Sequence, residues 1–206
     1  WKAYLRESIM EPAVGRDILV LEAVRKPALL RQVFAVCCGH PSQILALGKI
    51  AGAISDTGAL ETIAHYLNLL EEAYLVSPVR KFAATELRRR ASPPKVVPLS
   101  NAFLAAPLAG ESPTADSDPA AWGVWLENTC LAFAVGCGQS VHYWREEPLE
   151  VDAVLTGSWG KWALEIKSGD YTARDLSGLL EFCRRWPEYR PLVVGVAGNA
   201  DAAHKV

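Results

Sequence analysis

Two acidic residues and a lysine in the segment 149–167, LEVDAVLTGSWGKWALEIK, have side chains and spacing suited to phosphoester hydrolysis. Two alternating runs in this segment flank a turn rich in glycine and serine, a pattern that predicts a β-hairpin. With the turn centred between positions 158 and 159, Asp152 faces Glu165 and Glu150 faces Lys167. Because successive side chains of a strand alternate between its two faces, all four charged side chains are expected on one face.

The opposite face of this hairpin is expected to be apolar. It would carry Leu149, Val151, Ala153, Leu155, Trp162, Leu164 and Ile166. Facing Cβ atoms of an antiparallel pair lie about 4.5 to 5.5 Å apart, so Asp152 and Glu165 repel unless a cation lies between them or one is protonated. Magnesium commonly takes one or two carboxylates together with substrate phosphate oxygens. The pair therefore predicts a Mg²⁺ or Mn²⁺ site, in which Lys167 stabilises negative charge or helps to orient and deprotonate a water.

A purely structural interpretation competes with this one. A solvated hairpin face on which Lys167 pairs with Glu150 would offset the acidic repulsion, and such exposed pairs contribute about 0 to 1 kcal/mol. Acid clusters also occur in structural networks, so the hairpin alone favours this interpretation.

The elements around the hairpin predict a mixed sheet packed by helices. A helix is expected at 119–135, strands at 140–145, 149–156 and 161–167, a helix at 172–185 and a strand at 192–197. The order α-β-β-β-α-β is typical of a mixed sheet with helices on it.

The first part of the chain predicts helices instead. Apolar residues recur at three- and four-residue steps up to about Val76, without sustained alternation. A short helix at 42–52, a turn with N-cap candidates at Ser55, Asp56 or Thr57, and a helix with Leu60, Ile63, Ala64, Leu67 and Leu70 on one face resemble a helix-turn-helix. A strand at 76–82 would be the first strand of a wing.

We therefore predict an α+β fold with three parts. They are a helical, winged-helix-like module at 1–91, an irregular linker at 92–118 and a sheet domain at 119–206, cut short at its C-terminus. Proline, serine and acidic residues cluster at 92–98 and 110–119, and Pro98 interrupts the strand signal of its segment.

Composition limits the function classes. The chain has 206 residues, 50% of them hydrophobic, and a formal net charge of −2, which excludes a natively unfolded chain and a protein coated in positive charge. No run approaches the ~20 apolar residues of a membrane span. Five cysteines without a CxxC pair fit a reducing cytoplasm. No GxxxxGK[ST] phosphate loop occurs, so no ATPase site is expected here.

Several short motifs, taken in their order along the chain, resemble those of known families. Glu127 on a helix (WGVWLEN), Asp152 (LEVD) and Glu165-Ile166-Lys167 (EIK), followed by a helix, resemble the PD-(D/E)xK restriction-endonuclease-like fold. The words WKAYLRES, GRDIL, HYLNLLEEAYLV, PPKV, YWRE and EIKSG together resemble the C-terminal domain of unknown function of bacterial AAA-type ATPases. This implies that ATP would bind only in a part of the protein that precedes Trp1.

The nuclease resemblance implies roles for individual residues. Asp152 and Glu165 would bind the metal, joined by the backbone carbonyl of Ile166, Lys167 would be the catalytic lysine, and Glu127 an outer carboxylate. Three further polar residues are more peripheral candidates: Glu150, Ser168 and Asp175.

A basic stretch offers a nucleic-acid contact. Segment 79–95 holds six Lys or Arg residues against Glu86, and five of the six are candidates for phosphate contacts: Arg80, Lys81, Arg88, Arg89 and Arg90. A solvated loop, or a contact to the ATPase part, explains them equally well. The second helix of the helix-turn-helix exposes Glu61, Asn68, Glu71 and Glu72 and lacks Lys and Arg, so we expect protein contacts from it and not base reading.

The tryptophan, histidine and cysteine residues are expected to have structural roles. Trp122, Trp125 and Trp162 are expected in the core, with Trp159 exposed at a turn. His65 and His142 lack partners at metal-site spacing, and Cys37 and Cys38 are expected to be buried.

Two hypotheses remain open. The first is a Mg-dependent nuclease acting on DNA or RNA in an ATPase-associated protein. The second is a non-catalytic module of the same fold that binds nucleic acid or protein under control of the ATPase part. Oligomerisation is compatible with both.

Overall fold

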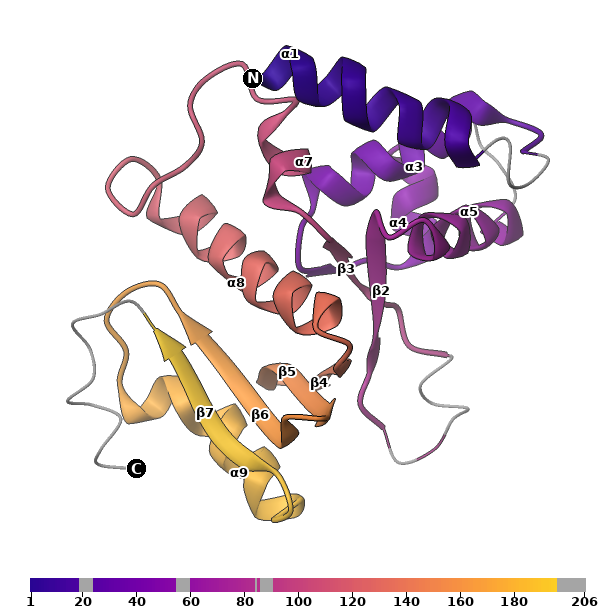
Figure 1. The fold of residues 1–206 in the computed structure, drawn as a ribbon. Coiled ribbons are helices and arrows are strands. Elements are labelled where there is room, and N and C mark those ends of the chain that lie inside the picture. The colour runs from indigo at the N-terminus through magenta and orange to yellow at the C-terminus, as the bar shows by residue number, and fades with distance from the viewer. Residues whose placement is uncertain (19–23, 55–59, 84, 86–90, 196–206) are drawn as a thin grey trace. The chain divides into compact units, whose positions relative to one another are not determined.

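The structure is a computed structural model that describes residues 1–18, 24–54, 60–83, 85 and 91–195 (Figure 1). The chain forms two compact units: residues 1–78 with 93–112, and residues 79–92 with 113–206. Strand β2 (Val76–Lys81) begins in the first unit and ends in the second. The α+β fold class is confirmed, with helices followed by a seven-stranded mixed sheet whose strand order is β1-β3-β2-β4-β5-β6-β7.

The first unit is mainly helical. In chain order it contains α1 (Lys2–Tyr4), the wide π turns η1 (Leu5–Met10) and η2 (Ala13–Asp17), α3 (Pro27–Gly39), β1 (Gln43–Ile44), α4 (Leu47–Gly52), α5 (Leu60–Glu72), β3 (Lys95–Pro98) and α7 (Asn101–Ala105). Helix α3 buries one apolar stripe, including Leu30 and Val33, in contact with α5. Phe34 meets Phe103 of α7 edge to face, with ring centroids 5.5 Å apart.

The helix pair α4–α5 is compatible with a winged helix, which stays a prediction. Helix α5 buries Ile63, Leu67 and Leu70 as expected, but Leu60 is 51% exposed. The predicted N-caps Ser55, Asp56 and Thr57 lie outside the described residues. The predicted helix at 42–52 is wrong in its first half, because Gln43 and Ile44 pair with β3.

The prediction of an irregular linker at 92–118 is wrong for residues 95–105, which form β3 and α7. Pro98, which has no N–H to donate, is the last residue of β3. The next N–H, that of Leu99, donates to the carbonyl of Leu75 at 3.0 Å. Residues 79–91 group with the second unit, whereas residues 93–112 group with the first.

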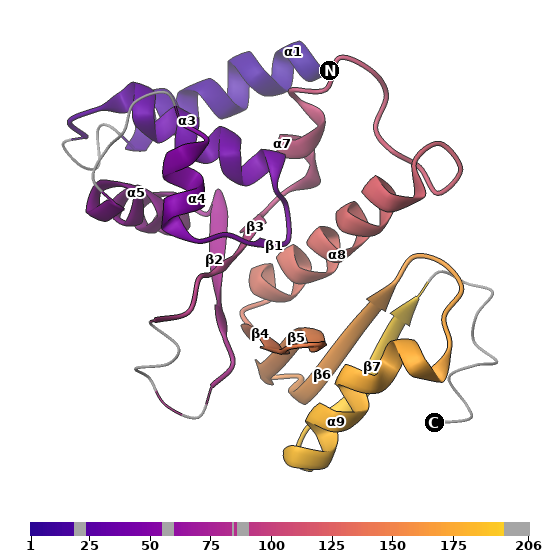
Figure 2. The ribbon, with the colours of Figure 1, turned by 180° about the vertical axis from the view of Figure 1, so that it is seen from behind.

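The second unit has the predicted order α-β-β-β-α-β. Its elements are α8 (Pro119–Gly136), β4 (Ser140–Glu146), β5 (Leu149–Gly157), β6 (Gly160–Lys167), the 3-10 turn η3 (Ala173–Leu176), α9 (Ser177–Arg185) and β7 (Arg190–Gly195). Strands β4, β5 and β6 are antiparallel, and β7 runs parallel to β6. Helix α9 lies behind β6 and β7 in Figure 1 and in front of them in Figure 2, so it covers one face of the sheet.

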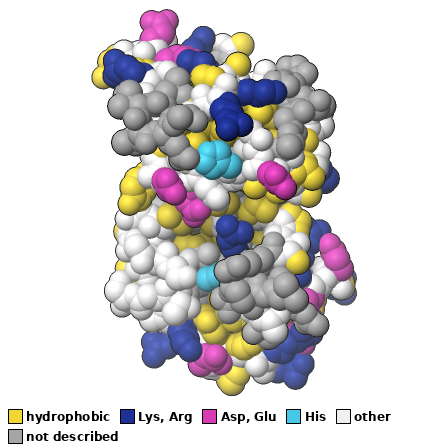
Figure 3. Space-filling model, turned by 90° about the vertical axis from the view of Figure 1, so that its right-hand side faces the viewer, with side chains coloured by type: hydrophobic (Ala, Val, Ile, Leu, Met, Phe, Trp, Pro, Cys, Tyr) yellow, Lys and Arg dark blue, Asp and Glu magenta, His cyan; other side chains and the backbone are white. Residues whose placement is uncertain are grey.

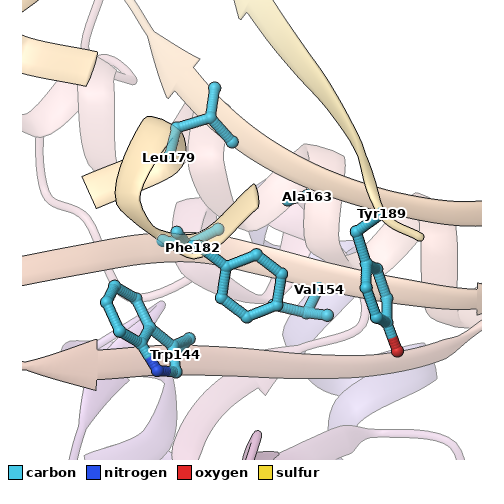
Figure 4. Close-up of a cluster of buried hydrophobic side chains, with 7 residues drawn as sticks. Trp144, Val154, Ala163, Leu179, Phe182 and Tyr189 are labelled. Atoms are coloured by element: carbon cyan, nitrogen blue, oxygen red, sulfur yellow. The ribbon is translucent and has the colours of Figure 1, made fainter. Parts of the chain in front are cut away.

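An aromatic core lies between α9 and the sheet. Phe182 of α9 packs between Trp144 and Tyr189, with Val154 beside the end of its ring (Figure 4). The Phe182 ring centroid lies 5.5 Å from that of Trp144 and 5.4 Å from that of Tyr189. This cluster fixes α9, and therefore the turn that precedes it, on the strands that carry the predicted acids.

Tryptophan placement confirms part of the prediction. Trp159 is 42% exposed at the hairpin turn, as expected. Trp122, Trp125 and Trp162 are only half-buried, and the deeply buried indole is that of Trp144, which the sequence did not single out. Among the described helices, none is both long and apolar enough to cross a lipid bilayer.

Candidate active site

The hairpin register is confirmed along most of its length. Ala153 pairs with Leu164, and Gly157 pairs with Gly160, as the position of the turn predicts. Gln139 holds the turn, because its amide donates to Ser158 Oγ at 2.9 Å and accepts from the N–H of Trp159 at 3.2 Å. The regular pairing stops one rung before Asp152 and Glu165.

A β-bulge in β5 explains where the pairing stops. His142 of β4 pairs with Val154 and Trp144 pairs with Val151, so three steps along β5 oppose two along β4. The extra residue places both Val151 and Val154 in the core cluster under α9. Our prediction of strict alternation over the whole hairpin is therefore wrong on β5. Bulges of this kind are common beside active sites, where they redirect a side chain.

Asp152 sits in this bulge and bonds across to β6. Its Oδ2 accepts the backbone N–H of Ile166 at 2.8 Å. The carboxylate thus takes over a ladder hydrogen bond at the point where the backbones of β5 and β6 no longer pair in register. The sequence predicted that Asp152 and Glu165 are neighbours, and the side chain of Asp152 does reach the backbone next to Glu165.

Glu165 is a buried acid whose two oxygens are in different environments. The residue is 8% exposed, and Oε1 accepts from Lys167 Nζ at 2.7 Å. Oε2 is buried and has no hydrogen-bond partner among the described residues. Burial, followed by the charge of Asp152, raises the pKa of Glu165 to about 7, although Lys167 acts in the opposite direction.

Lys167 is the cation of the site. Burial lowers its pKa, but the hydrogen bond to Glu165 and the charges of Glu165, Asp152 and Asp175 outweigh burial, so the pKa is raised. The ammonium therefore stays protonated at neutral pH. The structural interpretation, which pairs Lys167 with Glu150, is wrong. Lys167 bonds Glu165, and Glu150 forms an ion pair with Arg145 at 3.6 Å.

Helix α8 brings Glu127 towards the strands. Asp118 caps the helix by accepting the N–H of Ala121 at 3.0 Å, which fixes its start. Burial raises the pKa of Cys130, and the charges of Glu127 and Asp152 raise it further. Cys130 therefore lies near both carboxylates. No role for this cysteine is predicted from the sequence, although its position three residues after Glu127 places it on the same face of a helix.

The peripheral candidates have separate positions. Asp175 forms a capping box, in which its carboxylate accepts from the Thr172 N–H at 2.8 Å and from the Thr172 hydroxyl at 2.7 Å. Ser168 lies against α8, since a Cβ added to Gly123 would be 2.9 Å from Ser168 Oγ. Both residues therefore have structural contacts next to Lys167.

The acids fit a divalent cation in one respect and fall short in another. The buried Oε2 of Glu165 lacks a donor, and a cation would neutralise its charge beside Asp152. However, no group of three or more His, Cys, Asp or Glu side chains converges as a metal site within the part of the chain that the structure describes. Magnesium often uses only one or two carboxylates, so these two acids fit such an ion, with water and substrate completing its shell.

The predicted nucleic-acid contacts are only partly described. Arg80 and Lys81 end β2 beside β4, where they pair in register with His142 and Tyr143, whereas Arg88, Arg89 and Arg90 lie outside the described residues. Lys and Arg side chains on the face drawn in Figure 3 are interspersed with hydrophobic and acidic ones. Cys37 is buried, as predicted, and burial raises its pKa to about 12, whereas His65 lies exposed on α5.

Both parts of the chain match models of domain families. Residues 123–205 match a domain of unknown function, DUF4143, which is found in AAA-ATPase-associated proteins. No curated protein and no solved structure matches the chain. Residues 2–114, more than half of the sequence, match a second domain of unknown function, DUF8612. The chain therefore belongs to the family described as DUF8612, and its C-terminal part resembles the AAA-ATPase-associated domain DUF4143.

Proposed function

We propose that the second unit is a divalent-metal-dependent phosphodiesterase acting on DNA or RNA, in a protein associated with an AAA-type ATPase. The observation that carries the proposal is the buried Glu165 carboxylate, with one oxygen on Lys167 and the other without a donor, next to Asp152. A buried carboxylate oxygen without a hydrogen-bond donor lowers the stability of the folded protein. A catalytic role or a bound ion is a common reason for such a group to be present.

Each residue has a role in this proposal. Asp152, Glu165 and the carbonyl of Ile166 would hold Mg²⁺ or Mn²⁺, and Glu127 would act from α8 as an outer carboxylate. The cation would supply a Lewis acid for the phosphate group. Lys167, kept protonated by Glu165, would stabilise negative charge that develops on the phosphate; its raised pKa argues against a role as general base.

Manganese binding tests the proposal without a known substrate. Calorimetric titration of Mn²⁺ should show saturable binding to the wild type and at least tenfold weaker binding to D152N and E165Q. The control is E188Q, in the turn before β7, which removes a carboxylate that pairs with Lys161 at 3.8 Å, and Lys161 lies near the turn of the hairpin, opposite Thr156. Equal binding by all four proteins would reject the metal site.

Cleavage is then tested on single- and double-stranded DNA and RNA with Mg²⁺ or Mn²⁺. D152N and K167M should lose cleavage while staying folded, as judged by circular dichroism. Variants that cleave like the wild type would contradict the proposal.

A second candidate function is a non-catalytic binding module. It is favoured by the structural use of Asp152 as an acceptor for the Ile166 N–H. This alternative predicts nucleic-acid or protein binding in EDTA that D152N leaves unchanged.

A further inference from the structure

A pocket of about 270 Å³ lies in the second unit, where the end of β2 meets β4 and the end of α9, and neither Asp152 nor Glu165 lines it. It is lined by Lys81, Phe82, Ala83, Ala91, Ser92, Trp144, Glu146 and Trp186. Three of these residues are aromatic, one is a cation and one a carboxylate. The proposed phosphodiesterase does not use this pocket.

The aromatic walls of the pocket are held rigidly by the core. The Trp186 ring lies 4.5 Å from that of Phe182, centroid to centroid, at an interplanar angle of 33°. Phe82 meets Trp186 edge to face at 5.3 Å. Phe82 and Trp186 are both only half-buried, although each is fixed by several aromatic contacts. A flat ring could therefore stack in the pocket without rearranging the protein.

The polar rim is fixed as well. Arg185 bonds the Oε2 atom of Glu146 and lies over the ring of Trp144, with its guanidinium carbon 5.5 Å from the ring centroid. Arg185 also donates to Glu181 at 2.6 Å, so its guanidinium is held from two sides. Glu146 thus presents a hydrogen-bond acceptor at a set position, and Lys81 contributes a donor.

We infer that this pocket binds a nucleobase, either of a free nucleotide or of an unpaired residue in a nucleic-acid strand. Aromatic walls stack a flat heteroaromatic ring, and such stacking tolerates different bases because each has a π-face. The Glu146 carboxylate and the Lys81 ammonium, which both line the pocket, can pair with N–H and carbonyl groups on the edge of a base. A purely apolar ring, such as that of a phenylalanine side chain, would leave both polar groups unused.

Tryptophan indole N–H signals in ¹H–¹⁵N NMR spectra test the inference. The probes are the four nucleoside 5′-monophosphates, short single-stranded oligonucleotides and the same oligonucleotides with abasic sites. EDTA is present throughout, so that a failure of the metal site does not affect the result. Binding should shift the signal of Trp186, assigned with W186F, and leave that of Trp159, assigned with W159F, unchanged.

Two variants separate the pocket from general charge effects. E146Q should weaken base binding about tenfold or more, since a neutral amide accepts more weakly than a carboxylate and loses the ion pair with Arg185 that holds the side chain in place. The matched control E147Q alters the neighbouring carboxylate, which bonds Arg145 at 2.8 Å and does not line the pocket; it should bind like the wild type.

The outcomes decide both the inference and the source of the base. Mononucleotides that bind as tightly as oligonucleotides indicate a free nucleotide, whereas binding by intact oligonucleotides alone indicates an unpaired strand. The inference is overturned if abasic oligonucleotides bind as well as intact ones, if E146Q and E147Q bind alike, or if the Trp186 signal never shifts.

Discussion

The Oδ2 atom of Asp152 accepts the backbone N–H of Ile166 at 2.8 Å, where the regular pairing of β5 with β6 has ended. This single bond ties the predicted site to the fold, because the carboxylate that would bind a metal also joins two strands. Substitutions of Asp152 therefore have two effects that must be separated.

Asp152→Ala should destabilise the protein, whereas Asp152→Asn should not. Alanine leaves the Ile166 N–H without its acceptor, at a cost of about 1 to 3 kcal/mol, while the asparagine amide oxygen can replace it. Urea unfolding in EDTA measures the difference. Equal unfolding free energies for the two variants would show that the hydrogen bond contributes nothing.

Lys167→Met should destabilise the protein more at pH 8 than at pH 5. At pH 8 the buried Glu165 is ionised and would lose the charged hydrogen-bond donor Lys167, at a cost of roughly 3 kcal/mol, whereas at pH 5 it is protonated.

The control for this substitution is Lys161→Met, which removes an exposed lysine that pairs with Glu188 at 3.8 Å. It should change stability by less than about 1 kcal/mol at both pH values. A pH-independent loss in Lys167→Met would mean that packing, and not charge, explains its effect.

The metal-free wild type should lose stability as pH rises from about 4.5 to 7. The pKa of Glu165 is raised to about 7 in the folded state from an ordinary value of 4.5, so the folded state binds its proton more tightly. This contribution is complete below the unfolded pKa and lost as pH passes the folded pKa, by about 1 to 3 kcal/mol.

Glu165→Gln cannot titrate, so it should remove this part of the pH dependence. Thermal unfolding between pH 4 and pH 8 in EDTA would show the flatter profile. A wild-type slope that persists in Glu165→Gln would assign the titration to another group.

Gly178→Ala should destabilise the second unit. A Cβ at this position would lie 2.0 Å from the carbonyl oxygen of Glu150, so α9 would have to move away from β5, at a cost of about 1 to 3 kcal/mol. Gly136→Ala in α8 is the control, because a Cβ there meets nothing within 4 Å. Denaturant unfolding of both variants tests this, and equal stabilities would show that α9 adapts at no cost.

The element order and most of the hairpin register followed from the sequence alone. Alternation in 149–167 placed Ala153 opposite Leu164, because pairing shifted by one residue would expose apolar side chains and bury charged ones. The acidic and basic residues of the site were recognisable for the same reason: charged residues stand out in strands that are otherwise apolar.

Only the tertiary structure decided how these residues are used. The bulge in β5 depends on pairing with β4, a neighbour that no pattern within β5 encodes, and it directs Asp152 to the Ile166 N–H. Glu150 pairs with Arg145 because β4 places the two residues opposite each other, and Lys167 bonds Glu165 instead. Desolvation of Glu165 is likewise a property of the assembled sheet, because burial results from residues far apart in the chain packing together.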